Sequence, residues 1–350
     1  MGITKNRFGK TKNGEEAMLY TLVNQAGMGI EVTNYGATLV SVTTADSNGK
    51  FDDVVLGYDD VIDYCDNNGY FGAAIGRNGN RIKGATVTIG EKEYSLSKNE
   101  NNNSLHSGPH GFDKVIWETS ISDTELAVTF TYRSPDGDQG FPGNFDVKIT
   151  YSLSEDNEVV IHYVGVSDKD TIANVTNHSY FNLSGNGAIS VEEHQVQIMA
   201  DTFTVVDKES IPTGELRPVQ GTPMDFRTAK RIGQDIEQGY EQLSLASGYD
   251  HNFVLNNQNG KIRKCAVVCE ETTGRMMEVY TDCVGLQFYT GNKISDRFGK
   301  NGVSYTNRSG FCMETQYYPD CNHQVEFPSS ILKAGEIYDT TTIYKFMVKS

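Results

Sequence analysis

Residues 145–166 read FDVKITYSLSEDNEVVIHYVGV, and their pattern decides the fold class. From Phe145 to Leu153 apolar and polar residues alternate, which is the period of a β-strand with one buried face. Ser154–Asn157 supply a turn, and Val159–Val166 form a second predicted strand. Upstream, Leu126–Arg133 predicts a third strand, which a Ser-Pro-Asp-Gly-Asp turn separates from the first. The run therefore predicts a series of antiparallel strands.

Short strands of this kind recur along the whole chain. We expect further strands within Met18–Thr44, Asp53–Gly57, Gln195–Asp207, Tyr249–Leu255, Cys265–Glu270, Met276–Thr281, Gly285–Asn292 and Ile343–Val348. One short helix is expected at Thr228–Glu237, although Gly233 weakens it. Many strands with so little helix predict an all-β fold, a large antiparallel β-sandwich or barrel. No linker or low-complexity segment interrupts residues 1–350, so we expect a single domain.

Composition and charge exclude several classes of partner. The 350 residues carry a formal net charge of -16, which disfavours nucleic acid and anionic membranes. No apolar run approaches the roughly 20 residues of a membrane helix, and the first residues lack a signal-peptide core. The six cysteines include no CxxC pair, and several Asn-x-Ser/Thr sequons fall in the candidate site, so we expect a cytoplasmic protein with free thiols. An acidic surface leaves a monomer and a homodimer equally open.

Glu314 is the first candidate for chemistry. It lies in the middle of a strand predicted from Phe311 to Tyr317, among aromatic and apolar neighbours. A carboxylate there is costly unless a partner or a reaction uses it. A solvated or ion-paired strand residue is the alternative reading.

Two polar segments supply further candidates. Asn99–Trp117 contains His106 and His110 in an ordered loop, but these two are too far apart for a preformed metal pair, and we expect no metal. In Thr176–Ser184, His178 stands among hydroxyl and amide residues. Its ordinary pKa near 6.5 suits proton transfer to a polyhydroxyl compound, although a structural histidine is an equal alternative.

The glycine-rich segment Tyr70–Ile82 lacks the GxxxxGK[ST] phosphate loop, which disfavours a nucleotide cofactor. Its Arg77 and Arg81 are either side chains held by the loop or surface charges. Trp117 is expected to pack in the core.

Taken together, these segments resemble the aldose 1-epimerase, or galactose mutarotase, family. The resemblance runs in order from about Asn34 to Tyr344. The motifs that carry it are N-Y-G-A-T-L at Asn34, G-R-x-x-N-R-I at Gly76, N-x-x-x-L-H-x-G-x-x-G-F-D-K up to Lys114, T-N-H-S-Y-F-N-L-S-G at Thr176, D-H-N-F at Asp250, G-L-Q-F-Y-T-G-N at Gly285 and S-G-F-C-M-E-T-Q at Ser309.

The resemblance implies a β-supersandwich without metal or organic cofactor, and interconversion of the α and β anomers of a free hexose such as galactose or glucose. It assigns Glu314 as general base and His178 as general acid. The positions that hold the sugar are matched by Asn80, Arg81, His106, Asp250 and Gln287. Ser107 departs from the family, where Gly is usual, which affects the expected loop shape and sugar preference more than the reaction.

This chemistry needs one base and one acid. Opening a hemiacetal ring removes a proton from the anomeric hydroxyl and delivers one to the ring oxygen. We expect an ionised Glu314 and a protonated His178 on opposite sides of the sugar, with Trp117 and tyrosines as apolar walls. Activity should then depend on pH with a bell shape.

Three alternatives stay open at this point. A glycoside hydrolase or lyase would need a second carboxylate near Glu314, for which Asp250 is the candidate. A non-catalytic sugar-binding module would bind sugar without accelerating anomer exchange. A relative acting on phosphorylated hexoses is disfavoured because no added Lys/Arg cluster is evident.

Overall fold

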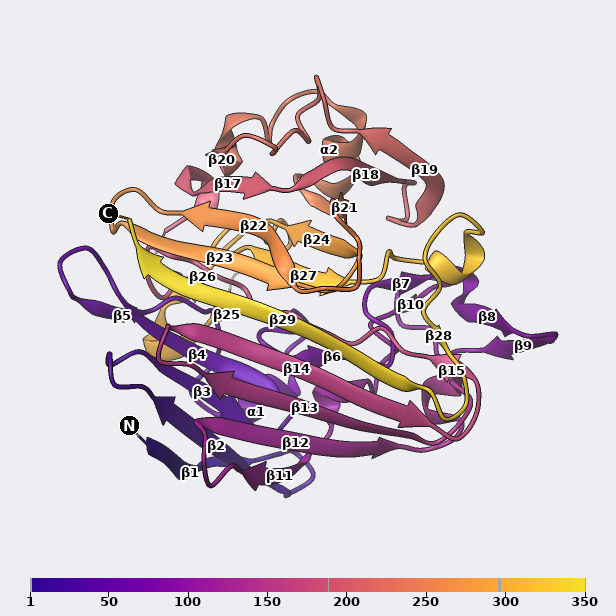
Figure 1. Cartoon of the computed structure of the whole chain (residues 1–350), viewed down its shortest axis with the longest axis horizontal. Helices are drawn as coiled ribbons and strands as arrows, with labels where there is room; N and C mark the ends of the chain where they lie inside the picture. The colour runs from indigo at the N-terminus through magenta and orange to yellow at the C-terminus, as the bar shows by residue number, and fades with distance from the viewer. Residues whose placement is uncertain (1, 188, 295–296, 350) are drawn as a thin grey trace.

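The structure, a computed structural model described for residues 2–187, 189–294 and 297–349, consists of layered antiparallel sheets (Figure 1). The largest sheet has nine strands and crosses the front of the view in Figure 1. Its strands, in spatial order, are β11 (Glu118–Ile121), β12 (Ala127–Ser134), β13 (Phe145–Leu153), β14 (Glu158–Ser167), β29 (Ile337–Val348), β23 (Arg275–Thr281), β22 (Arg263–Cys269), β17 (Gln195–Ile198) and β20 (Lys230–Arg231).

Two five-stranded sheets lie behind it. The first contains β1 (Gly2–Lys10), β2 (Glu16–Val23), β3 (Gly29–Thr33), β4 (Thr38–Ala45) and β5 (Phe51–Asp53). The second contains, in spatial order, β19 (Pro212–Pro218), β18 (Ala200–Val206), β21 (Asp250–Leu255), β24 (Gly285–Tyr289) and β27 (Cys312–Gln316).

Short strand pairs and helices complete the fold. The pairs are β6 (Ala74–Ile75) with β16 (Thr176–Asn177), β7 (Arg81–Ile82) with β10 (Ser104–Leu105), β8 (Thr86–Ile89) with β9 (Lys92–Ser95), β15 (Thr171–Ile172) with β28 (Ile331–Leu332), and β25 (Arg297–Phe298) with β26 (Ser304–Tyr305). The α-helices in the described ranges are α1 (Val61–Cys65) and α2 (Glu241–Ala246). Neither is long and apolar enough to cross a membrane.

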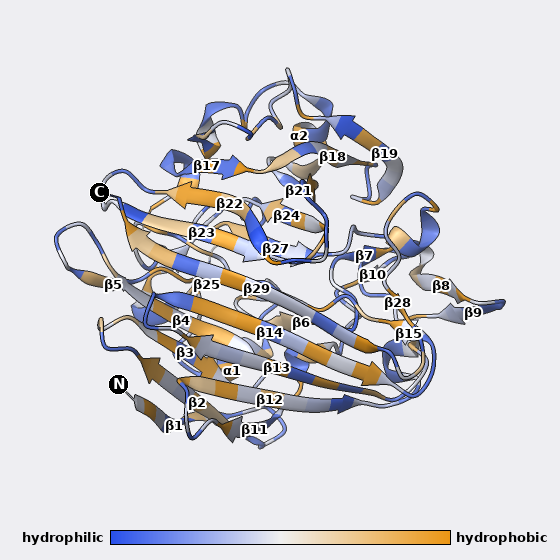
Figure 2. Ribbon diagram, in the orientation of Figure 1, coloured by the Kyte–Doolittle hydropathy of each residue, from blue (hydrophilic) through white to orange (hydrophobic). Residues whose placement is uncertain are grey.

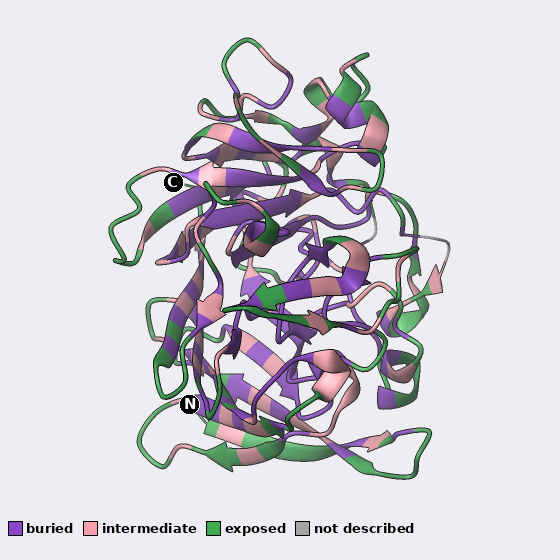
Figure 3. Cartoon of the chain, turned by 90° about the vertical axis from the view of Figure 1, so that its right-hand side faces the viewer, coloured by how far each residue is buried: buried purple, intermediate pink, exposed green. Residues whose placement is uncertain are grey.

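One apolar core joins the large sheet to both smaller sheets. Along β13 the residues from Phe145 to Leu153 are alternately buried and accessible, and this period is visible as alternating bands on the strands in Figure 2. Buried side chains of the large sheet contact both five-stranded sheets. The ring of Phe130 on β12 lies 6.0 Å from that of Tyr20 on β2, and the hydroxyl of Tyr344 on β29 donates to the carbonyl of Met313 on β27 over 2.8 Å. Figure 3 shows the buried residues between the layers and the exposed ones at the rims. The predicted β-sandwich is therefore confirmed.

Two expected elements are wrong. Thr228–Glu237 is not an α-helix, because Lys230–Arg231 pair with Gln195–Val196 at the edge of the large sheet and a short 3-10 turn follows at Ile232–Gln234. A strand partner distant in sequence has overridden the local helix preference. The strand expected at Asp53–Gly57 is also misplaced, since it ends at Asp53 and only an isolated bridge at Val55 continues it.

Burial distinguishes between the expected roles of two side chains. Arg77 is buried, and its guanidinium donates to Ser134 and to the carbonyls of Pro142 and Gly143, so it is a structural cross-link and not a surface charge. Trp117 belongs to the apolar core, as expected, where its indole N–H donates to the carbonyl of Phe112.

Candidate active site

Strand β27 places Glu314 by its register. Residues directly opposite each other on antiparallel strands share one face of the sheet. Glu314 lies opposite Gln287 on β24, and Gln287 lies opposite Asn252 on β21. The neighbouring row on this face holds Cys312, Tyr289 and Asp250. Three strands thus gather polar side chains from distant parts of the chain on the sheet face that turns away from the apolar core.

Two short strand pairs bring the histidines to this face. Asn80 precedes β7 and His106 follows β10, and the two residues are bound to each other twice. The N–H of Asn80 donates to Nδ1 of His106 over 3.1 Å, and the N–H of His106 donates to the carbonyl of Asn80 over 3.0 Å. His178 follows β16, where its N–H donates to the carbonyl of Ala73 over 3.0 Å. The backbone therefore fixes the imidazole of His106 and the main chain that carries His178.

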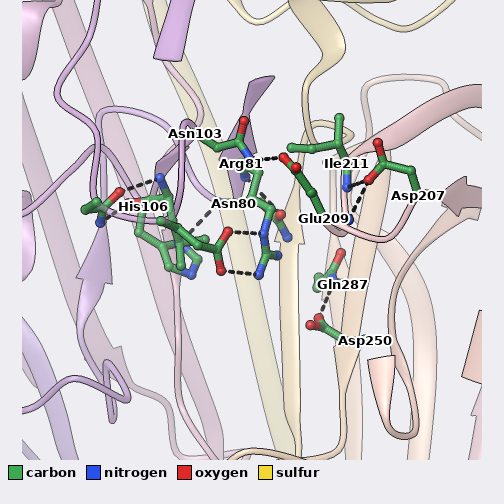
Figure 4. Close-up of polar contacts among 12 residues, drawn as sticks. Asn80, Arg81, Asn103, His106, Asp207, Glu209, Ile211, Asp250 and Gln287 are labelled. Atoms are coloured by element: carbon green, nitrogen blue, oxygen red, sulfur yellow. Dashed lines mark hydrogen bonds and ion pairs between the residues drawn. The ribbon is translucent and has the colours of Figure 1, made fainter. Parts of the chain in front are cut away.

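These residues surround a cavity of about 180 Å³. Of the residues predicted from sequence, its lining contains Asn80, Arg81, His106, His178, Asp250 and Glu314. Gln287 does not line it directly, but its amide donates to the carboxylate of Asp250 over 2.7 Å (Figure 4). The structure thus gathers all seven predicted site residues, and their roles in a reaction stay predictions. Of the two roles expected for Trp117, the structure shows packing in the core and not a wall of the cavity, and Tyr70, Tyr180 and Tyr289 supply the aromatic walls.

Glu314 and His178 form the most deeply buried acid–base pair of the cavity. Nε2 of His178 lies 3.7 Å from Oε1 of Glu314, and their side chains are 7% and 2% exposed. Burial, together with the nearby charge of Asp250, raises the pKa of Glu314 well above its usual range. Burial lowers the pKa of His178 to about 4. These shifts favour a neutral pair in the free protein, with the proton on Glu314, which is the reverse of the distribution expected from sequence.

The two side chains lie side by side. The two oxygens that exchange protons when a hemiacetal opens are bonded to the same carbon. An acid and a base close together can therefore reach both of them, so the reaction does not require the expected placement across the ring, which stays a prediction.

The imidazole of His106 joins the pair, and the three residues offer ligand atoms within 4.8 Å of one another. Two imidazoles and a carboxylate are a donor set that transition metals accept. Here, however, Nδ1 of His106 accepts the N–H of Asn80, so the ring proton of neutral His106 is on Nε2. A nitrogen that carries a proton donates a hydrogen bond and cannot bind a metal. The hydrogen bonds of His106 thus favour recognition of a hydroxyl group.

Arg81 is held by a residue that sequence reasoning missed. Its Nε and Nη2 donate to the two carboxylate oxygens of Glu100 over 2.6 and 2.8 Å. The loop of Glu100 is itself tied across the site, because the amide of Asn103 donates to the carboxylate of Glu209 over 3.0 Å (Figure 4). Glu100 is recognised only from its contact with Arg81 in the folded structure, because its sequence neighbours are turn residues of no particular pattern.

Further lining residues were not singled out from the sequence: Asn68, Gly69, Leu105, Lys293 and Arg297. Tyr70, Tyr180 and Tyr289 fit the general expectation of tyrosine walls, and the glycine-rich and His178 motifs, which contain Tyr70 and Tyr180, were the available signal. Lys293 and Arg297 bring positive charge to the cavity, which the sequence did not indicate.

Comparisons with known proteins identify the family of the chain. Residues 18–345 match the family model described as aldose 1-epimerase. The chain is 40% identical to galactose mutarotase of Bos taurus over 99% of both chains, and 40% identical to aldose 1-epimerase of Haemophilus influenzae over 95% of this chain and 97% of the other. The fold is similar to the crystal structure of an aldose epimerase homologue from C. elegans, with a TM-score of 0.88, 28% identity, and coverage of 95% of this chain and 100% of the other.

The family model spans nearly the whole chain, and the similarity to relatives extends over all three large sheets and the short strands that carry the histidines. The chain therefore belongs to the aldose 1-epimerase family of isomerases, which interconvert the α and β anomers of aldoses.

Proposed function

We propose that Glu314 and His178 carry out this anomer exchange on a free hexose, with Glu314 as base and His178 as acid. The observation that carries the proposal is their contact: a carboxylate and an imidazole, both buried, meet 3.7 Å apart at the wall of one cavity. A buried acid–base pair of this kind is costly to the fold and is of use where protons are transferred.

The proposed reaction keeps one proton on the pair throughout. Ionised Glu314 takes the proton of the anomeric hydroxyl while protonated His178 gives one to the ring oxygen. The bond from the anomeric carbon to the ring oxygen breaks, and a carbonyl forms. After rotation about the adjacent carbon–carbon bond, the reverse transfers close the ring on the other face. Each positioned group contributes about 10²–10⁴-fold to the rate.

Burial suits the middle of this cycle. Once the ring is open, Glu314 is protonated and His178 is neutral, and this is the pair that burial favours in the free protein. Arg81 acts in the opposite direction, because its positive charge lowers the pKa of Glu314. Sugar hydroxyls that donate to Glu314 would add to this effect. The ionised and neutral pairs are thereby brought closer in free energy, which lowers the barrier between them.

The remaining predicted residues hold the sugar. Arg81 and Asp250 present a charged donor and a charged acceptor, each fixed by a partner: Glu100 for Arg81 and Gln287 for Asp250. Nε2–H of His106 is oriented to donate to a hydroxyl, since Asn80 binds Nδ1. Fixed partners of this kind reduce the ordering that binding requires. The relatives named galactose mutarotase support galactose as a substrate, with glucose as the second candidate.

Three broader proposals accompany this one. Residues 1–350 act as one domain, which is supported by a site whose residues come from segments between Asn80 and Glu314. A cytoplasmic location is supported by the six cysteines, which are all unpaired. The net charge of -16 disfavours nucleic acid and anionic membranes, and the protein is a monomer or a homodimer.

Polarimetry of freshly dissolved α-D-galactose and α-D-glucose tests the proposal. The intact protein is expected to speed relaxation to the unchanged equilibrium rotation, and the Glu314→Gln and His178→Asn variants are expected to lose this effect while still binding sugar. Full activity in either variant would refute the assigned roles. Binding without any acceleration by the intact protein would favour a sugar-binding module, and release of sugar from an aryl galactoside would favour a hydrolase.

A further inference from the structure

Cys312 lies beside the proposed acid and has been given no role so far. It precedes Glu314 by two residues on β27, so both side chains are on the same face of the sheet. Its Sγ lies 3.5 Å from Nδ1 of His178, on the far side of the imidazole from Glu314. Cys312 is fully buried, and burial raises the pKa of its thiol well above the usual range, so the S–H remains protonated.

The two histidines of the cavity differ in what binds Nδ1. For His106 the partner is the backbone N–H of Asn80, which can only donate. If His106 gained a second proton, its Nδ1–H would face this N–H, so His106 is held neutral. For His178 the partner is a thiol, which donates through S–H and accepts weakly through sulfur. The thiol can therefore satisfy Nδ1 both without a proton and with one.

We propose that Cys312 is a positioning residue that lets His178, and not His106, gain and lose a proton during the reaction. Its sulfur accepts from Nδ1–H of neutral His178, which leaves Nε2, where Glu314 and the sugar lie, free to take a proton. When His178 is protonated, Nδ1–H still donates to the sulfur and Nε2 carries the second proton. Nε2 thus gains and loses the proton that is transferred, while Nδ1 keeps its own. The inference rests on the proposed role of His178 as acid.

Other groups also face the imidazole and affect its protonation. They are the carboxylate of Glu314, the ring of His106 at 5.2 Å, the rings of Tyr70, Tyr180 and Tyr289 at 5.9, 5.0 and 6.4 Å, and, through its charge, Asp250. Among these, Glu314 is the one in contact with Nε2, and none is recorded as a partner of Nδ1 among the described residues. Removing the thiol thus takes away the side-chain partner of Nδ1, a change that none of the other groups offsets.

Variants of Cys312 test the inference through kcat, the pH profile and the imidazole tautomer. Cys312→Ala is expected to lower kcat about tenfold, as loss of an orienting hydrogen bond does, with little change in KM, and to shift the limb of the pH profile that reports His178. Cys312→Ser keeps a donor and acceptor and should restore most of kcat. In ¹⁵N NMR, neutral His178 of the intact protein should carry its proton on Nδ1, and Cys312→Ala should show a mixture of tautomers.

The control is Cys265→Ala, which removes another buried thiol, one that donates to the carbonyl of Val279 in the large sheet. It should reduce stability by a similar amount and leave kcat and the pH profile unchanged. The inference is overturned if Cys312→Ala keeps the kcat and pH profile of the intact protein, if Cys265→Ala reproduces its effects, or if neutral His178 carries its proton on Nε2. Activity of His178→Asn, measured alongside, separates the two claims: full activity there refutes the role of His178 itself, whereas its loss beside an unaffected Cys312→Ala refutes only the role of Cys312.

Discussion

Strands β13 and β27 have similar sequence patterns but opposite surroundings. On β13 the apolar residues face the core, while Asp146 and Lys148 are exposed on the outer face of the large sheet. On β27 every residue is buried, including Glu314 and Gln316. Oε2 of Glu314 and both amide atoms of Gln316 have no hydrogen-bond partner among the described residues, and the same holds for Oε1 of Gln287.

Buried polar atoms without partners are uncommon in proteins and need an explanation. The outer face of β13 has water as its partner. The polar face of β27 lies in and beside a cavity sized for one small polar molecule, and a sugar brings hydroxyl groups to it. The difference between the two strands is thus one between a face built for solubility and a face built for a ligand.

The largest effect is expected from removing the carboxylate of β27, and removing a carboxylate of β13 provides the control. Glu314→Gln should lower kcat by about 10²–10⁴-fold, because it removes the proposed base. It should also raise stability above pH 4.5: since burial raises the pKa of Glu314, keeping this group in the fold costs progressively more as pH rises towards its folded-state pKa. Polarimetry and urea unfolding at pH 7 measure the two effects.

Asp146→Asn is the matched control on β13. Asp146 is exposed, and its ion pair with Arg133, at 3.4 Å, is exposed as well. The substitution should change neither kcat nor, beyond about 0.5 kcal/mol, the free energy of unfolding. A loss of stability in Glu314→Gln at pH 7 would contradict the comparison.

The histidines allow the same comparison of buried and exposed residues through the pH dependence of stability. Burial lowers the pKa of His178 and His194 to about 4 and that of His251 to about 3, from an ordinary 6.5. Below pH 6.5 the unfolded chain therefore binds protons that the folded chain does not, and the free energy of unfolding should fall between pH 6.5 and 4, by several kcal/mol in order of magnitude. Urea unfolding at a series of pH values measures this decrease.

Single variants attribute the decrease to burial. His194→Gln keeps an acceptor for the N–H of Leu183, which donates to His194 Nε2, and should make the decrease smaller. His162→Gln, on the more exposed face of β14 beside Asp339, should leave it unchanged. Equal effects of the two variants would contradict the role assigned to burial.

A smaller effect is expected from the clamp on Arg81. Glu100→Gln removes the charge that holds the guanidinium at two points, so KM should rise about tenfold with a smaller change in kcat. Glu158→Gln, which weakens the pair with Lys345 at 3.0 Å on the large sheet, is the control and should alter neither constant. An unchanged KM in Glu100→Gln would show that Arg81 is oriented without this partner.

The sequence predicted more of the sheets than of the connections. The alternation in β13 and β14 and the strands β22 and β23 were predicted, and each of these pairs is joined by a short turn. The edge strand at Lys230–Arg231 was not, since its partner β17 lies more than thirty residues away and the local pattern resembles a helix.

The site divides in the same way. Glu314 stood out as a carboxylate in an aromatic and apolar strand, His178 as a histidine among hydroxyl and amide residues, and the family resemblance supplied the sugar-binding positions. Glu100 and Lys293 lie in loops, and their place in the cavity depends on how those loops fold against other segments. The protonation of the pair was also not predictable, because it depends on burial that only the packed structure creates.

The most direct test of the central claim is the pH profile of kcat/KM for the intact protein, which reports the free pair. The pair should be active while it carries one proton. Activity should rise through about pH 4, where doubly protonated pairs lose the proton on His178, and fall at higher pH, where Glu314 loses the last proton at its raised pKa. A bell-shaped profile with these two limbs would support Glu314 and His178 as one catalytic unit, and a flat profile would contradict it.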